Sequence, residues 1–120
     1  MGGRGQRRDW FAEGIALFND ARYFECHEAW EQVWLREQGD EKRFVQGLIQ
    51  VAVAILHAER GNFAGAKSLS EKGLDKLKTF PSEHRGIALG DLRDALSAFF
   101  AEVIESAPAD LPTRPKLRVC

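Results

Sequence analysis

The sequence is poor in cysteine, and this excludes two common kinds of small domain. It holds 2 cysteines in 120 residues, Cys26 and Cys120, with no CxxC spacing between them. Neither a disulfide framework nor a cysteine-ligated zinc site is therefore expected. Cys26 lies inside a helical pattern and is expected to be a small core residue, whereas Cys120 is expected to be an exposed thiol.

A charge excess of one sign is also missing. The chain has 17 Lys+Arg against 18 Asp+Glu, for a formal net charge of −1. This balance gives no electrostatic reason to expect nucleic acid or a membrane surface as a partner. The one basic patch is GGRGQRR near the start, and residues 1–8 are expected to be a disordered arm. They lack the apolar run of a signal peptide, and a cytoplasmic location is expected.

Strand patterns and nucleotide-binding motifs are absent as well. Apolar and polar residues do not alternate, and there are no hairpin turn signals. A glycine-rich phosphate loop, a GxSxG elbow and a Rossmann fingerprint are all missing. The periodicity instead predicts an all-α, single-domain bundle of about five helices in antiparallel hairpins. These helices are expected over residues 9–19, 23–37, 41–60, 63–78 and 87–105.

The expected domain layout has three parts. Residues 9–106 form the bundle, after the arm and before an extended, proline-rich tail over 107–120. Asp9, Asp40 and Asn62 are the expected N-caps of the first, third and fourth helices. Leu111 and Leu117 are available to hold the tail across the bundle.

The stretch Phe44–His57 organises the predicted core. Eight of its apolar residues spread over most of a helical wheel, which is typical of a buried helix: Phe44, Val45, Leu48, Ile49, Val51, Val53, Ile55 and Leu56. At about 14 residues the stretch is too short to span a membrane. One polar stripe remains, formed by Arg43, Gln46, Gln50 and His57. Gly47 and Ala54 beside it would let the second helix come close.

The second helix carries ionisable groups among aromatics. With His27 at 0° on the wheel, Glu31 lies at about 40° and Trp34 at about −20°. His27 and Glu31 are thus predicted on the apolar face, with Glu28 at its margin. The predicted solvent face consists of Arg22, Glu25, Ala29, Gln32 and Arg36.

This placement predicts a polar seam between the second and third helices. A buried polar atom without a partner costs roughly 1–3 kcal/mol, so Glu31 needs a donor or a cation. The polar stripe of the third helix could supply it. The candidate ligand-binding residues are His27, Glu28, Glu31, Gln46, Gln50 and His57.

Two other interpretations stay open. The run His27-Glu28-Ala29-Trp30-Glu31 is an HExxE variant of the HExxH zinc helix, with Glu31 in place of the second histidine. His27, Glu31 and His57 could then hold a divalent metal, with Glu28 as the base of a metal-assisted hydrolase. Alternatively the polar residues are purely structural, as a satisfied network or a solvated stripe. No other cofactor is expected.

Several motifs in order resemble the domain of unknown function 309 (DUF309) family. They are Leu17-Phe18-Asn19, Tyr23 to Glu31 with Trp34, Gln46-Gly47-Leu48-Ile49-Gln50 with His57, and Gly61 to Ala66. The resemblance implies a small, all-helical, cytoplasmic protein of prokaryotic type and no particular activity. The signature positions of the family fall on the six candidate residues. The sequence therefore predicts a binding or interaction module for a small polar ligand or a protein partner, and leaves enzymatic activity open.

Overall fold

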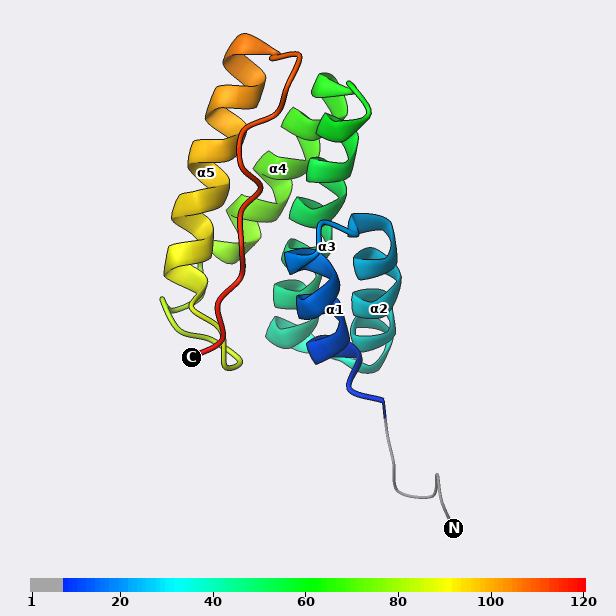
Figure 1. The fold of residues 1–120 in the computed structure, drawn as a ribbon. Coiled ribbons are helices and arrows are strands. Elements are labelled where there is room, and N and C mark those ends of the chain that lie inside the picture. The colour runs from blue at the N-terminus through cyan, green and yellow to red at the C-terminus, as the bar shows by residue number, and fades with distance from the viewer. Residues whose placement is uncertain (1–7) are drawn as a thin grey trace.

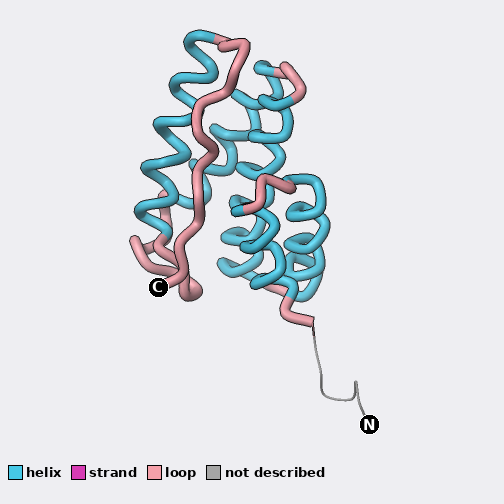
Figure 2. Tube along the Cα trace, viewed as in Figure 1, coloured by secondary structure: helices cyan, strands magenta, loops and turns pink. Residues whose placement is uncertain are grey.

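The computed structural model describes residues 8–120, so most of the predicted basic arm lies outside the described part. Five helices follow one another (Figure 1): α1 (Trp10–Asn19), α2 (Tyr23–Arg36), α3 (Gly39–Glu59), α4 (Phe63–Leu77) and α5 (Leu89–Ser106). Residues 8–120 contain no strand, only isolated β-bridges at Ile87, so the prediction of an all-α bundle is confirmed (Figure 2). No helix in this range has the length and apolarity to cross a membrane.

The helix N-termini follow the predicted chemistry at two of three positions. The Asp9 side chain accepts a hydrogen bond from the Ala12 N–H, and the Asn62 side chain accepts one from the Gly65 N–H. Asp40 was expected to cap α3, but the N-cap is Gln38 and Asp40 lies in the first turn. There its carboxylate still interacts favourably with the positive end of the helix dipole.

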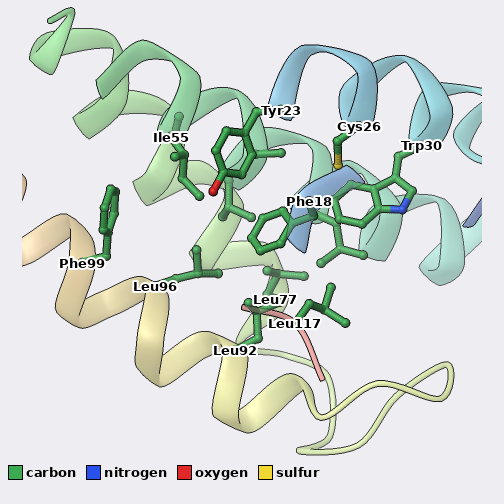
Figure 3. Packing of buried hydrophobic residues seen from close by; sticks show 14 of the residues in the cluster. Phe18, Tyr23, Cys26, Trp30, Ile55, Leu77, Leu92, Leu96, Phe99 and Leu117 are labelled. Atoms are coloured by element: carbon green, nitrogen blue, oxygen red, sulfur yellow. The ribbon is translucent and has the colours of Figure 1, made fainter. Parts of the chain in front are cut away.

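The core draws on all five helices and on the tail. Each helix packs mainly on its neighbours in sequence, so α3 lies between α2 and α4. Figure 3 shows Phe18 of α1, Trp30 of α2 and Leu117 of the tail pointing into one apolar cluster. Both predictions for the cysteines are confirmed, since Cys26 is buried and Cys120 is exposed.

Helix α3 is the predicted core helix, although it is not buried on every side. Five of its eight apolar residues are fully buried: Phe44, Val45, Leu48, Val51 and Ile55. The other three, Ile49, Val53 and Leu56, are half-buried. Ile49 and Val53 lie on the same side of the helix as Gln46, so α3 keeps an outward face of mixed character.

Helices α3 and α4 approach each other closely at two glycines. A Cβ on Gly73 would lie 2.9 Å from the Gly47 carbonyl oxygen and 3.1 Å from the Val51 nitrogen. A Cβ on Gly47 would lie 3.2 Å from the Gly73 carbonyl oxygen. The expectation that Gly47 admits the second helix is therefore wrong, since its neighbour is α4. A helical wheel locates a gap on one helix but does not identify the helix that fills it.

The tail crosses the bundle and is anchored at α1. After α5 the chain turns at Ala107 and runs back beside that helix (Figure 1). The Asn19 side chain pairs with the Leu117 backbone in both directions, donating to its carbonyl at 2.8 Å and accepting from its N–H at 2.7 Å. Leu117 is buried and Leu111 is half-buried, so the expected contact of the tail with the bundle is confirmed.

Replacing Gly73 tests the α3–α4 contact. Gly73→Ala is expected to lower the free energy of unfolding by about 1–3 kcal/mol, because the new methyl group would press on the α3 backbone. This loss outweighs the gain of up to about 1 kcal/mol in helix propensity. Ser68→Ala, at an exposed position of the same helix, is the control and should be neutral or slightly stabilising in urea denaturation. If Gly73→Ala instead stabilised the protein as much as Ser68→Ala, the contact between α3 and α4 would have space for the added methyl group.

Asn19→Ala tests the anchor of the tail. The substitution leaves the N–H and the carbonyl of Leu117 without their side-chain partner, at an expected cost of about 1–3 kcal/mol. Asp20→Ala, one residue further on and exposed, should change stability by less than about 0.5 kcal/mol. Thermal and urea unfolding of both variants measure the difference, and a neutral Asn19→Ala would contradict a stabilising role for the pairing.

Candidate functional site

The buried face of α2 is not the face that the sequence predicted. It is formed by Tyr23, Cys26, Ala29, Trp30 and Val33. Ala29, predicted on the solvent side, is buried because α1 packs there. Gly14 of α1 lies against the Trp30 indole, whose Nε1 donates to the Phe11 carbonyl at 3.2 Å. The centre of this face lies near Cys26, about 100° around the helix from His27.

This rotation places Glu31 at the surface and leaves His27 half-buried. Their side chains are 29% and 52% exposed, and 3.8 Å separates His27 Nε2 from Glu31 Oε2. The prediction that Glu31 is buried among apolar side chains, and so needs an internal partner, is wrong. Phe24 and Leu35, which made this side look like core, are themselves 51% and 60% exposed. Helix α2 has apolar residues on two of its sides, and only one of these two sides faces the core.

Three of the four residues in the predicted polar stripe of α3, namely Arg43, Gln50 and His57, contact α4 or its N-cap. Gln50 Oε1 accepts from Lys76 Nζ at 3.0 Å, and His57 Nδ1 lies 3.0 Å from the side-chain Nδ2 of Asn62, the N-cap of α4. Gln46 is half-buried on the same stripe. Among the hydrogen bonds and ion pairs within residues 8–120, none joins the α2 candidates to those of α3. The predicted α2–α3 seam is therefore not formed.

The two groups nevertheless lie on neighbouring outward stripes. Lys42 Nζ, one turn before Gln46, lies 4.1 Å from the centre of the Trp34 ring. Trp34 follows Glu31 by one turn on α2, so this contact joins the edges of the two stripes. We define the α2 stripe as Phe24, Glu28, Glu31 and Leu35. We define the α3 stripe as Gln46, Gln50, Val53 and His57.

Glu28 lies at the edge of a groove between α1 and α2. The groove has a volume of about 440 Å³, and Leu17 and Ala29 lie along it. Nearby, Arg22 and Glu25 form an ion pair at 3.1 Å. Glu28 is exposed and, within the described residues, takes part in no ion pair. It is therefore a charge that the fold leaves available at the surface.

The candidate metal ligands do not form a group. Residues 8–120 contain no cluster of three or more His, Cys, Asp or Glu side chains that could hold a metal ion. His27 and Glu31 share a face of α2, but His57 lies on α3 and its side chain is hydrogen-bonded to the side chain of Asn62 at the start of α4. The hydrolase interpretation, which needed all three with Glu28 as base, is thus left without a ligand set.

A second polar cluster had no sequence signal. His84 Nε2 lies 2.5 Å from Glu41 Oε2, and its ring packs between Phe44 and Phe80 at 4.5 and 4.9 Å. Arg85 donates to Glu41 at 3.1 Å and also to Glu37. The loop before α5 has no periodicity from which this pairing could be inferred. Its groups satisfy one another and fasten that loop to the start of α3.

A match to a protein-family model agrees with the resemblance that the motifs carry. The model of the family described as "Domain of unknown function (DUF309)" matches residues 11–69. This segment, which spans α1 to the middle of α4, therefore belongs to that family. All six candidate residues lie within it.

Two relatives are themselves described as uncharacterised. The chain is 41% identical over 66 residues to the uncharacterised protein YpuF of Bacillus subtilis (strain 168). The aligned segment covers 54% of this chain and 36% of YpuF. It is also 27% identical over 108 residues to an uncharacterised protein of Aquifex aeolicus (strain VF5). That aligned segment covers 89% of this chain and 31% of the relative. The chain thus spans about a third of the length of these relatives.

Substitution of the α2 candidates distinguishes a surface site from a structural network. Because the His27–Glu31 pair is solvated and 3.8 Å long, Glu31→Ala and His27→Ala should each cost less than about 1 kcal/mol. Val33→Ala, on the buried face of the same helix, is the control and should cost about 2 kcal/mol. Urea denaturation reports all three values. A loss above about 3 kcal/mol at Glu31, as for a broken buried pair, would restore the structural interpretation.

Proposed function

We propose that this domain is a protein-interaction module that binds its partner through the α2 stripe. The observation that carries the proposal is the exposure of Phe24 and Leu35, at 51% and 60%, on one line of α2. Eleven positions separate them, which is about three turns or roughly 16 Å along the helix axis. A single exposed apolar residue needs no explanation, but a matched pair on one helical line is a typical anchor pattern for a helical contact.

The fold does not require these two side chains to be apolar. Phe24 packs on the His27 ring, with 6.1 Å between ring centres, while Tyr23 and Trp30 fill the core side of the helix. Leu35 is more exposed still and lies near the end of α2. Burial by a partner would release the water around both side chains, which is the main favourable term in protein association.

A protein segment fits this surface better than a small polar molecule. Small ligands bind in concave sites that bury most of their surface. The α2 stripe is instead a row of exposed side chains on one helix, and of its four residues Glu28 alone lines the groove between α1 and α2. The relatives support the same proposal, because a domain that matches about a third of a longer chain is suited to act together with other segments.

Site-specific photo-crosslinking tests the proposal. A benzophenone amino acid in place of Phe24, in cells that naturally produce the chain, is expected to give a discrete protein adduct. The adduct should disappear when Leu35→Ser is added, since the second anchor is then lost. Leu35 is exposed, so this change should alter stability by no more than about 0.5 kcal/mol.

Lys67 provides the matched control position. It is exposed on α4 and paired with Glu71, away from the α2 stripe. The same crosslinker at Lys67 should give no such adduct, and Lys67→Ala should leave the adduct at position 24 intact. Identical products from positions 24 and 67, or an adduct that survives Leu35→Ser, would overturn the proposal.

A further inference from the structure

We infer that the α2 stripe selects a helix that carries Lys or Arg between two apolar anchors, and that it rejects a second copy of itself. This inference rests on the proposed function and adds the chemistry of the partner. It is carried by the order of the residues along the stripe, in which two carboxylates lie between two apolar side chains. All four residues are exposed.

The spacing makes self-association unfavourable in either orientation. If two copies pair antiparallel about a two-fold axis, Phe24 of one copy meets Leu35 of the other and Glu28 meets Glu31. If they pair in parallel, each carboxylate meets its own counterpart. Both of these pairings, which bury the apolar anchors, place like charges opposite each other, which is destabilising and more so as water is excluded.

The charges around the stripe leave its acidic character in place. Two arginines line the same groove as Glu28, and each is paired with another carboxylate: Arg22 with Glu25 at 3.1 Å and Arg8 with Glu13 at 2.7 Å. Glu31 has only the longer contact with His27, and Glu28 has no ion-pair partner among residues 8–120. A partner helix with Lys or Arg opposite these two carboxylates would convert the repulsion into attraction while its apolar residues cover Phe24 and Leu35.

The expected complex belongs to the weak class. One helix lying on one helix buries less than the roughly 1,200 Å² of a standard interface. The partner is therefore expected to exchange readily unless further contacts add to this one. Charge then decides which helix binds, because the apolar anchors alone do not distinguish one amphipathic helix from another.

The chain itself can serve as the probe. The double variant Glu28→Lys/Glu31→Lys imitates the proposed partner, because its α2 stripe carries two lysines between the apolar residues Phe24 and Leu35. The wild-type chain alone and the variant alone should each stay monomeric near neutral pH and low salt, while an equimolar mixture should form a heterodimer. We expect the association constant of the mixture to exceed either homotypic value by at least about tenfold in sedimentation equilibrium.

Two controls separate recognition by the stripe from general attraction between charges. Glu102→Lys/Glu105→Lys makes the same charge change at exposed positions of α5 and should not associate with the wild-type chain. Adding Leu35→Ser to both members of the mixture should abolish the heterodimer. Glu28→Gln/Glu31→Gln, which removes the repulsion without adding lysine, should self-associate more tightly than the wild-type chain.

The outcomes bear differently on the two proposals. A mixture that associates no better than its components, or equally with the α5 variant, overturns the inference about charge. If the crosslink at position 24 still depends on Leu35 in that case, the interaction module stands and only its partner chemistry is wrong. Self-association of the wild-type chain that Leu35→Ser removes would also overturn the inference, because the stripe would then accept a second copy.

Discussion

The contact between the α3 and α4 backbones at Gly47 and Gly73 is the constraint on which the rest of the structure depends. Neither glycine has a side chain, so the two backbones approach each other and the Leu77 side chain lies directly against Gly47 of α3. With α4 held this closely, Lys76 reaches Gln50, and the start of α4 reaches His57. The polar stripe of α3 is thereby engaged on the side away from α2, and α2 is left to present its own charges to solvent.

Much of the fold followed from periodicity and capping. The five helices lie where apolar spacing predicted them, with ends that differ by a few residues at most. Asp9 and Asn62 were recognisable as caps because a short polar side chain preceded each apolar run. Asp40 failed by the same criterion because α3 begins two residues earlier than predicted, at Gly39. Such local rules work when the information lies within one turn of helix.

The candidate site was less predictable, for a reason visible in α2. Tyr23, Trp30 and Val33 are apolar on one side, while Phe24 and Leu35 are apolar on another. A wheel adds both groups into one broad face and places His27 and Glu31 at its centre. Which group is buried depends on α1, and α1 packs over Ala29, a residue that looks solvent-facing among charged neighbours. Even so, the family signature and the wheel led to the same six residues. The fold places five of them on the two defined stripes and His27 beside the α2 stripe.

The Asn19–Leu117 pairing has a kinetic consequence. These residues are 98 positions apart in the chain, whereas the contacts between successive helices span far shorter loops. Closing a long loop costs chain entropy before any contact repays it. We therefore expect the helical hairpins to assemble first and the C-terminal segment to dock last. In the native state the same segment should be the first to detach, so its amides would exchange with solvent through partial openings while the centre of α3 remains protected.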